Sequence, residues 1–440
     1  MKRTLLGGLL GAALALGGAI PAKADPVTIT LARFFGACEG DYGASTDVAK
    51  ARGECGIITT LVNKFNAENQ GAIVVKPQII EWNPYYNTIT ARLVSHDVPT
   101  VAIMHMSQLG DYTARKLVQP LDQVFKDAGI DTADFTPAAK NGTQIDGHFY
   151  ALPWDTHSWL WHYNVGLMKQ AGLVDASGTP IVPKSLDELL EQAKTFRAKT
   201  GKPLLLIAVT PDLASSARTF YTYLGQDGGA LFPKDPAHSD FSTPQARKAV
   251  ETIQAMYANS PHNEDYDAAT AAFPNGQSGI YMSGTWLIDS FSADAAKPGN
   301  ALSQGYWVTA FPTLLGKPAV WADGHSWVLL RGAVNDANRP AVLKFLKFMY
   351  DNNYEWARTG HLPIRQSVIT SAAFLDLPYR KNIAVISQDA VILPHAVRRQ
   401  FGIQSIVNEE VNNVLMNGKT IDAALASAQQ RTNTLLANTH

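Results

Sequence analysis

Hydrophobic residues recur with two different periods in the first third of the chain. Residues 27–32 (VTITLA) alternate β-branched and other positions, which predicts a strand. In residues 57–69 the apolar positions are spaced as on one face of a helix. Residues 72–80 and 100–104 read as further strands, with a helix over 85–94 between them. Strand and helix therefore alternate, which predicts an α/β layer with parallel strands.

The rest of the chain predicts a second α/β unit. A Ser cap at Ser185 with Glu188 three residues later opens a helix over 185–200. Further helices are expected over residues 243–257, 340–351 and 420–436. Short strands are expected over residues 149–153, 160–163, 203–209, 279–282 and 307–310.

The first 24 residues read as a secretory signal. A basic start (MKR) precedes an apolar run over 5–20 and the small-residue pattern Ala22-Lys23-Ala24. The alternative is a membrane anchor, but a run of about sixteen apolar residues is short of the roughly 20 that a span needs. We therefore expect cleavage near Ala24/Asp25 and a periplasmic protein.

Composition narrows the classes of function. The 440 residues are 46 % apolar and 17 % charged, with 37 basic and 38 acidic side chains. A net charge of −1 provides no basic face for nucleic acid.

The two cysteines, Cys38 and Cys55, are close in sequence, and in an exported chain such a pair favours a disulfide over a redox or metal centre. Closing this loop should stabilise the fold by about 3 kcal/mol.

Motifs for cofactor or metal chemistry are missing from the sequence. No GxxxxGK[ST], GxGxxG, HExxH or GxSxG pattern occurs. The histidines are scattered apart from His157 and His162, and these two have no supporting ligands nearby in the sequence. We expect no cofactor, no metal site and no catalytic residues.

One aromatic stretch, residues 152–164 (LPWDTHSWLWHYN), is the candidate for binding chemistry. Strand alternation places Trp159, Trp161 and Tyr163 on one face, where they are expected to pack a core. By contrast, the segment 154–157 follows a proline at a strand end in a polar setting. A ring, a carboxylate, a hydroxyl and an imidazole together are typical of sugar recognition, because an aromatic face covers the C–H side of a pyranose while polar groups bond its hydroxyls.

Five segments in order resemble one known family. Residues 61–71 (LVNKFNAENQG), 99–104 (PTVAIM), 146–153 (DGHFYALP) followed by 162–164 (HYN), 276–286 (GQSGIYMSGTW) and 360–365 (GHLPIR) are similar to motifs of extracellular solute-binding proteins. The resemblance is to the carbohydrate-uptake class of ABC importers, family 1, which includes maltose- and glycerol-3-phosphate-binding proteins. It extends over nearly all of the mature chain, although Thr100 stands where the family usually has Asp.

The resemblance implies an α/β protein with the two-lobed periplasmic-binding-protein fold of type II. Each lobe would be a sheet flanked by helices, and a hinge would let the lobes close on a ligand between them. Residues 1–24 would be the signal peptide, 25–136 plus 308–351 the N-terminal lobe, and 137–307 plus 352–440 the C-terminal lobe. The crossings would lie near Thr136, Trp307 and Asn352. The protein would be a monomer that delivers its ligand to the permease subunits of the importer.

Family motifs and strand ends together give the expected ligand-binding residues. The rings of Trp154, Trp286 and one of Trp82 and Tyr86 would stack on ligand, and Gly284 would let the backbone approach it. The full set is Phe35, Trp82, Tyr86, His105, Ser107, Trp154, Asp155, His157, Gly284, Trp286, Gly324, His325 and Arg365, with Phe34 as a further rim position.

Three functions compete. The first is binding of a carbohydrate, from mono- to oligosaccharide, for import. The alternative is binding of glycerol-3-phosphate or another phosphorylated polyol, in which Arg365 with His105, His157 or His325 would hold the phosphate. A secreted carbohydrate-active enzyme is the distant third. It would need two carboxylates, for which Glu81 and Asp155 are the candidates. We expect a binding protein and no enzyme.

Overall fold

A five-stranded sheet forms the centre of the first lobe. In this computed structural model, which describes residues 25–209, 214–261, 264–386 and 390–438, the strand order is β2-β1-β3-β12-β6. The first three strands run parallel, whereas β12 is antiparallel to both β3 and β6. The bounds are β1 Val27–Arg33, β2 Ile73–Ile79, β3 Val101–His105, β6 Leu152–Pro153 and β12 His325–Val328. The three parallel strands confirm the expected α/β layer.

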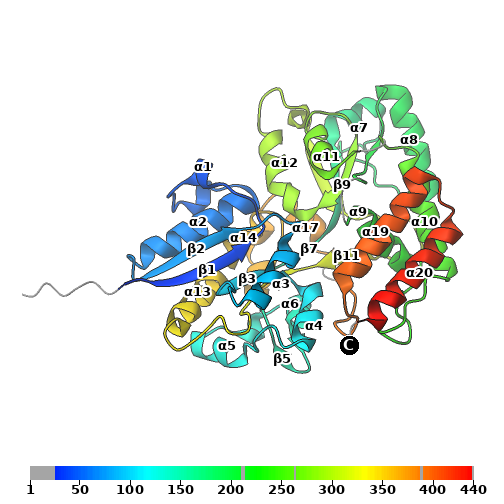
Figure 1. The fold of residues 1–440 in the computed structure, drawn as a ribbon. Helices are drawn as coiled ribbons and strands as arrows, with labels where there is room; N and C mark the ends of the chain where they lie inside the picture. Colours follow the sequence, from blue (N-terminus) through cyan, green and yellow to red (C-terminus); the bar gives the residue numbers. More distant parts are fainter. Residues whose placement is uncertain (1–24, 210–213, 262–263, 387–389, 439–440) are drawn as a thin grey trace, which may run out of the picture.

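Helices pack on both sides of this sheet, as Figure 1 shows for the left half of the molecule. They are α1 Glu39–Tyr42, α2 Gly53–Glu68, α3 Tyr85–Ser95, α4 Met106–Ala114, α5 Asp122–Ala128, α6 Pro137–Thr143 and α13 Arg339–Asp351. A small two-stranded sheet of β4 Gln144–Ile145 and β5 His148–Phe149 lies beside them. Short 3-10 turns occur at Val48–Lys50 and Thr132–Asp134.

The second lobe is built around one long strand. All ten residues of β7, Asp155–Asn164, are buried, and the strand order is β14-β11-β7-β9-β8 with β10 and β13 also paired to β7. The other bounds are β8 Leu205–Leu206, β9 Ile280–Gly284, β10 Tyr306–Ala310, β11 Val320–Asp323, β13 Leu362–Pro363 and β14 Ala390–Val391. The expected strand over 203–209 is thus confirmed only at its centre.

The helices of the second lobe lie on the right of Figure 1. The longer ones are α7 Val165–Ala171, α8 Leu186–Thr200, α9 Ser215–Gln226, α10 Pro244–Tyr257, α11 Tyr266–Ala272, α12 Ile288–Ala295, α19 Gln400–Asn417 and α20 Ile421–Ala437. The shorter ones are α15 Gln366–Ile369, α16 Ala372–Leu375 and α17 Arg380–Ile383, with 3-10 turns at Thr285–Leu287 and Ala301–Gln304. The short helix α14 Asn353–Ala357 lies instead in the left half of Figure 1, beside α2 of the first lobe. Ser185 caps α8 as expected, because its side chain accepts from the Glu188 backbone N–H.

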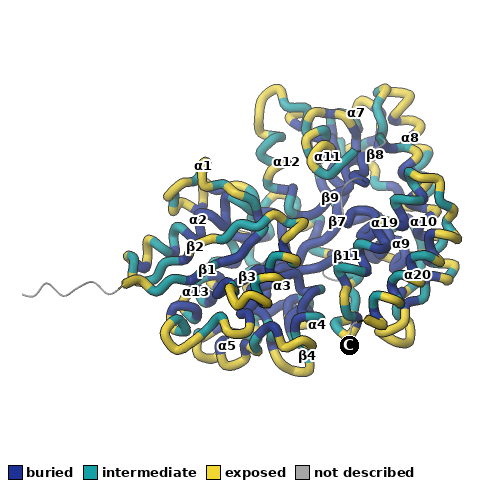
Figure 2. The backbone as a smooth tube through the Cα atoms, viewed as in Figure 1, coloured by how far each residue is buried: buried dark blue, intermediate teal, exposed yellow. Residues whose placement is uncertain are grey.

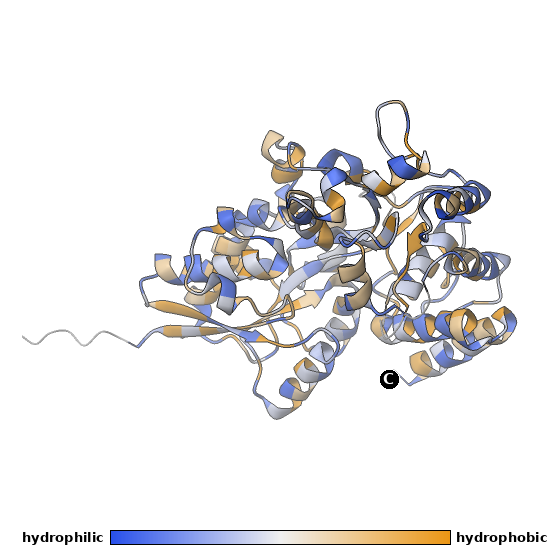
Figure 3. Ribbon diagram, turned by 90° about the horizontal axis from the view of Figure 1, so that it is seen from above, coloured by the Kyte–Doolittle hydropathy of each residue, from blue (hydrophilic) through white to orange (hydrophobic). Residues whose placement is uncertain are grey.

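Each lobe has its own hydrophobic core. One core gathers around β1, β3 and α2, and the other around β7, β9, α9 and α10. Figure 2 shows the buried segments in the interior of both lobes, with the exposed segments on the outer helices and loops. In Figure 3 hydrophobic residues run along the strands of the first lobe, while the outer helices mix both kinds of residue. The two cores confirm a two-lobed α/β fold.

Three passages of the chain between the two sheets were expected, and two of them lie elsewhere in the structure. Leu152 and Pro153 still belong to the first sheet, so the first passage lies at Trp154, not near Thr136. Strands β10 and β11 both pair with β7, so the return lies at Gly324, not near Trp307. The last passage follows α13 and reaches the second sheet at β13. Local patterns predict strands but carry no information on which sheet a strand joins.

No helix among the described residues is long and apolar enough to cross a membrane. The expected signal segment, 1–24, lies outside the described residues.

Candidate functional site

A cavity of about 430 Å³ lies between the two lobes. This volume is within the range of roughly 300–1,000 Å³ that is common for small-molecule sites. The first lobe contributes Phe34, Glu54, Glu81, Trp82, Asn83, His105 and His325, and the second contributes His157, Ala214, Arg218, Asp265, Tyr266, Asp267 and Trp286. A ligand in this cavity would therefore touch both lobes at once.

Strand ends place the first-lobe residues. Phe34 follows β1, Trp82 follows β2 by three residues, and His105 is the last residue of β3. The carboxyl ends of parallel strands share one edge of a sheet, which is where ligands bind in α/β folds. The Phe34 ring stacks on His105 at 5.2 Å and on Trp82 at 6.0 Å between centroids. These rings form one apolar wall of the cavity.

The opposite wall comes from the second lobe. The Arg218 guanidinium of α9 lies over Trp321 at 4.3 Å, Trp159 at 5.4 Å and Trp286 at 5.5 Å from the ring centroids. Trp286 follows β9, and its indole N–H donates to the Tyr266 hydroxyl at 2.6 Å. Cation–π contacts with a desolvated guanidinium hold these rings in fixed orientations.

Four histidines surround one buried carboxylate at the floor of the cavity. Asp155 is fully buried. One of its carboxylate oxygens lies 3.0 Å from His157 Nδ1, and the other lies 2.8 Å from His325 Nδ1 and 2.7 Å from the Trp356 indole nitrogen, which donates to it. The His325 backbone N–H also donates to the first oxygen at 3.1 Å. Asp155 therefore ties the first residues of β7 to the start of β12, where the chain passes between the lobes.

Two further histidines complete this group. The His105 Nδ1 lies 2.6 Å from the Tyr86 hydroxyl, and its ring centroid is 4.7 Å from that of His325. His361 bridges the lobes, because its Nε2 lies 2.8 Å from a Glu54 oxygen and its Nδ1 3.1 Å from the Thr285 hydroxyl. The sequence predicts no metal site at His157 because no other potential ligand lies close to it along the chain. The fold brings His105, His325 and His361 next to it, so this argument no longer holds.

Burial and neighbouring charges set the protonation states here. Burial, reinforced by the nearby His325, lowers the pKa of His157 to about 3. Burial and the His325 and His157 rings likewise hold the pKa of His105 well below its usual value. Burial alone would raise the pKa of Asp155, but the surrounding histidines outweigh it and keep this pKa well below its usual range. At neutral pH Asp155 is therefore ionised between neutral His105 and His157 rings.

The cavity lining is acidic. Its described residues include four carboxylates, those of Glu54, Glu81, Asp265 and Asp267, against the single guanidinium of Arg218. The site therefore favours neutral or cationic groups over anionic ones.

Five of the expected ligand-binding residues line the cavity: Trp82, His105, His157, Trp286 and His325. Ser107 lines a small adjoining hollow of about 40 Å³ instead. There its hydroxyl donates to Asp323 at 2.6 Å, and its backbone N–H donates to the other oxygen of the same carboxylate.

Four other expected residues act from behind the lining. Tyr86 contacts His105, and Phe35 packs edge-on against His325 at 5.1 Å. A side chain on Gly284 would overlap the Trp286 ring, so this glycine makes room for the indole and not for ligand. At Gly324 a side chain would overlap Met106 and the Asp155 carbonyl, where the passing strands meet.

The remaining three expectations need correction. Trp154 is fully buried in the first core, with its ring 5.4 Å from Trp356 and 5.7 Å from Trp327, so it is a packing residue. Asp155 does not line the cavity, because its oxygens are bonded to His157, His325 and Trp356. Arg365 lies elsewhere, where its Nε donates to Asp134 at 2.8 Å and its guanidinium covers Tyr350.

Sequence reasoning missed several lining residues, above all Glu54, Arg218 and Tyr266. Arg218 sits inside helix α9 with no motif around it, so its three Trp partners become neighbours only through the fold. Glu54 did carry a signal, because it precedes Cys55 in the loop that the disulfide closes.

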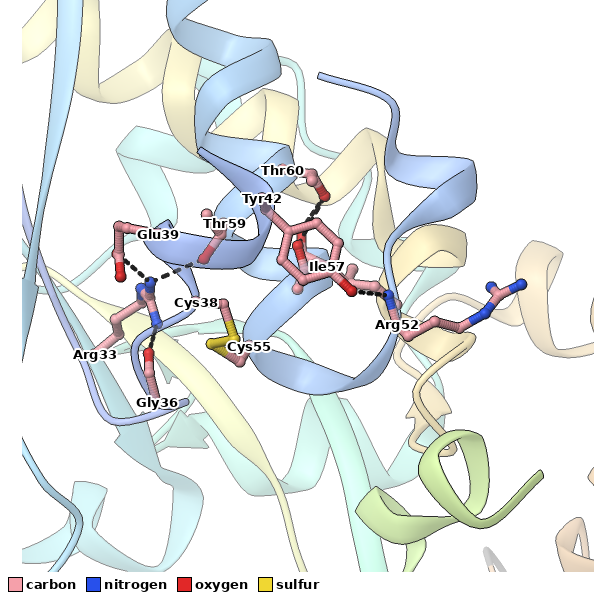
Figure 4. The surroundings of a disulfide bond; sticks show 11 residues. Arg33, Gly36, Cys38, Glu39, Tyr42, Arg52, Cys55, Ile57, Thr59 and Thr60 are labelled. Carbon is pink, nitrogen blue, oxygen red and sulfur yellow. Dashed lines mark hydrogen bonds and ion pairs between the residues drawn. A yellow bond between two sulfur atoms is a disulfide. The ribbon is translucent and has the colours of Figure 1, made fainter. Parts of the chain in front are cut away.

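The expected disulfide is confirmed. Cys38 and Cys55 are bonded, with Cα atoms 5.8 Å apart. Figure 4 shows the bond between the loop after β1 and the first turn of α2. At the end of β1 the buried Arg33 donates to the Gly36 carbonyl of this loop at 2.5 Å and to the Thr59 hydroxyl of α2 at 3.1 Å. Because Phe34 and Glu54 both line the cavity, the disulfide fixes two parts of its rim together.

Comparisons with known proteins agree with this architecture. Residues 60–382 match the model of the bacterial extracellular solute-binding protein family. The diacetylchitobiose-binding protein DasA of Streptomyces coelicolor is 24 % identical over 74 % of this chain and 72 % of its own. The sn-glycerol-3-phosphate-binding periplasmic protein UgpB of Escherichia coli K12 is 26 % identical over 96 % of each chain.

A solved structure extends the likeness to the fold. Maltose-bound MalE3 of T. maritima superimposes with a TM-score of 0.77 at 16 % identity, over 93 % of this chain and 100 % of that one. The family match covers well over half of the sequence, and the structural match extends over nearly the whole chain. The chain belongs to the family of bacterial extracellular solute-binding proteins.

Proposed function

We propose that this protein captures a carbohydrate in the cavity between its lobes and delivers it to the permease of an ABC importer. The family supplies the general role, which is binding of a solute outside the cytoplasm. The choice of carbohydrate is supported by the cavity and by relatives whose names state diacetylchitobiose or maltose as ligand.

One observation carries the proposal: aromatic rings face the cavity from both lobes, with polar groups between them. Trp82 and Phe34 lie on one side, and Trp286 on the other. Pyranose rings present C–H faces to such rings, and their hydroxyls can bond carboxylates and imidazoles at the edges. Glu54, Glu81 and Asp265 provide these acceptors.

The phosphorylated-polyol alternative fits the lining less well. UgpB is similar over almost the whole chain, so the alternative has a specific relative behind it. A phosphate, however, would face four carboxylates and one guanidinium among the described lining residues. Arg365, the expected phosphate ligand, is paired with Asp134 away from the cavity. Repulsion between like charges therefore favours an uncharged sugar.

We further propose that the chain binds without catalysis, acts as a monomer and is exported to the periplasm after cleavage near Ala24/Asp25. The enzyme alternative needs two free carboxylates flanking a scissile bond. One of its two candidates, Asp155, has both oxygens engaged by His157, His325 and Trp356. The Glu81–Asp155 pair expected from the sequence therefore does not provide two free carboxylates.

A thermal-shift screen of the mature chain tests the proposal. Ligands that bind only the folded state raise its stability by about 2.7 kcal/mol at a concentration of 100 times Kd. We expect mono- or oligosaccharides to raise Tm in a concentration-dependent manner, with the sugars recovered unchanged. Stabilisation by glycerol-3-phosphate alone would establish the alternative, and appearance of cleaved sugars would establish an enzyme.

A further inference from the structure

The cluster of His105, His157 and His325 has the arrangement of a metal site. The three rings lie at the floor of the cavity, with centroids 4.3 to 5.6 Å apart. One ring nitrogen from each lies within 4.8 Å of the others. The three residues are buried, with exposed fractions of 5 %, 1 % and 4 %. Each of them lines the cavity.

Backbone pairing holds the three residues in place. His105 at the end of β3 lies directly opposite His325 in the antiparallel β3–β12 pair. His157 lies opposite Asp323 in the β7–β11 pair, two residues from His325 along the chain that connects the sheets. The cluster is therefore built on strands of both lobes and not on mobile loops, which gives the precision that metal coordination requires.

In each of the three imidazole rings one nitrogen is bonded to a residue outside the cluster, which leaves the other nitrogen for the cavity. The Nδ1 atom is engaged in every ring: by the Tyr86 hydroxyl in His105, and by the two Asp155 oxygens in His157 and His325. The second ring N–H of a coordinating histidine typically donates to a carboxylate, a backbone carbonyl or a water, which fixes the tautomer and the ring orientation. One buried carboxylate here orients two rings.

We propose that the Nε2 atoms of His105, His157 and His325 bind a divalent transition-metal ion, Zn²⁺ above all, at the floor of the cavity. Imidazole ligands suit zinc, and three histidines with one open position form a recognised zinc geometry. Ligand nitrogens about 2.0–2.1 Å from zinc would lie roughly 3.4 Å apart. Ring nitrogens that now lie within 4.8 Å of one another would therefore close by up to about 1.4 Å. The open position faces the cavity, where a ligand hydroxyl or a water would complete the coordination.

The other two groups of possible ligands are less suited to a metal. His361 has both ring nitrogens bonded, to Glu54 and Thr285. Asp155 has both oxygens bonded within the cluster. The acidic lining around the three-histidine group adds attraction for a cation.

Zinc titration of the untagged, chelator-treated mature chain tests this proposal without any sugar. We expect one Zn²⁺ per chain, and Co²⁺ in its place should give the visible absorption of a tetrahedral ion. His157→Gln and His325→Gln should each weaken zinc binding by at least about tenfold, and Asp155→Asn by about 10–100-fold through loss of ring orientation. His162→Gln is the matched control, because that histidine is buried in the same strand but bonds Tyr306 away from the cavity.

Thermal unfolding without metal should show that each variant is folded before its zinc affinity is compared. No saturable zinc uptake by the wild type would overturn the proposal. So would equal zinc affinity in the wild type and in both histidine variants, which would place the ion on surface residues. If the protein binds zinc but no sugar, the metal site is supported and the proposed carbohydrate function is wrong. If it binds sugar but takes up no zinc, the proposed function is supported and the metal site is wrong.

Discussion

Adjacent residues at the start of β7 serve different parts of the molecule. Trp154 packs the first core, Asp155 orients two histidines, and His157 reaches the cavity. Trp159 lies behind the residues that line the cavity, and its ring contacts Arg218 and Trp286. The aromatic stretch that the sequence singles out therefore lies mainly behind the cavity, and His157 is the residue of this stretch that lines it.

Deeper in the same strand, His162 should make stability depend on pH. Burial lowers its pKa to about 3, whereas an unfolded histidine titrates near pH 6.5. Between these values the unfolded chain binds more protons, so the free energy of unfolding falls as pH falls. At pH 5 the loss from this one group is about 2 kcal/mol.

Chemical denaturation of wild type and His162→Gln at pH 7.5 and pH 5 measures this effect. Acidification should cost the variant about 2 kcal/mol less than the wild type, because the other buried histidines are common to both. An equal loss in the two proteins would show that His162 is protonated in the folded state.

Individual residues were predictable where a local pattern decides their position. His105 ends a strand, and Trp82 and Trp286 follow shortly after strands. The carboxyl ends of parallel strands meet at one edge of a sheet. The histidine cluster was not predictable, because His105, His157 and His325 are far apart in the sequence and only the pairing of β3, β12, β7 and β11 joins them. Trp154 was misplaced because its burial depends on which sheet receives Pro153.

At the scale of elements, the disulfide joins the loop after β1 to helix α2. The loop carries Phe34 and the first turn of α2 carries Glu54, so the bond fixes both lining residues. The sequence predicted this bond correctly, since two cysteines in an exported chain offer one pairing. It predicted the helices α2, α3, α8, α10, α13 and α20 for a similar reason, because their apolar faces and caps are local.

Replacing both cysteines, Cys38→Ser with Cys55→Ser, should lower the free energy of unfolding by about 3 kcal/mol. The chain gains conformational freedom when unfolded, and the rim of the cavity loses a constraint. Urea denaturation of the variant, beside wild type with and without reductant, measures the change. A variant as stable as the oxidised wild type would show that the surrounding bonds of Arg33 hold the loop unaided.

At the scale of the whole molecule, contacts between lobes flank the cavity. Phe401 of α19 packs on Trp82 at 4.9 Å and on Tyr86 at 5.3 Å, and the Gly53 backbone N–H donates to Asp289 at 2.6 Å. The two lobes are thus in direct contact beside the cavity. Passages at Trp154 and Gly324 are where backbone rotation would open it, by the hinge motion of two-lobed binding proteins.

Phe401→Ala should weaken ligand binding without touching the ligand. Loss of two aromatic contacts across the lobes costs the closed state about 1 kcal/mol, or roughly fivefold in Kd. Phe348→Ala is a suitable control, because that ring packs on Phe65 in the first lobe alone. Small-angle scattering should show a larger decrease in radius of gyration on ligand binding for the Phe401 variant, whose free form is more open. Equal affinity and equal compaction in both variants would mean that these contacts do not stabilise closure.

Calorimetric titration of a sugar from the screen into wild type, Trp82→Ala, Trp286→Ala and Trp307→Ala tests the central claim most directly. Trp82 and Trp286 line the cavity from opposite lobes, whereas Trp307 packs on Tyr163 outside it. The account predicts one site in the wild type and a loss of about 1 kcal/mol or more in each of the first two variants, with Trp307→Ala unchanged. Wild-type affinity in both cavity variants would contradict the claim that a carbohydrate is held between these rings.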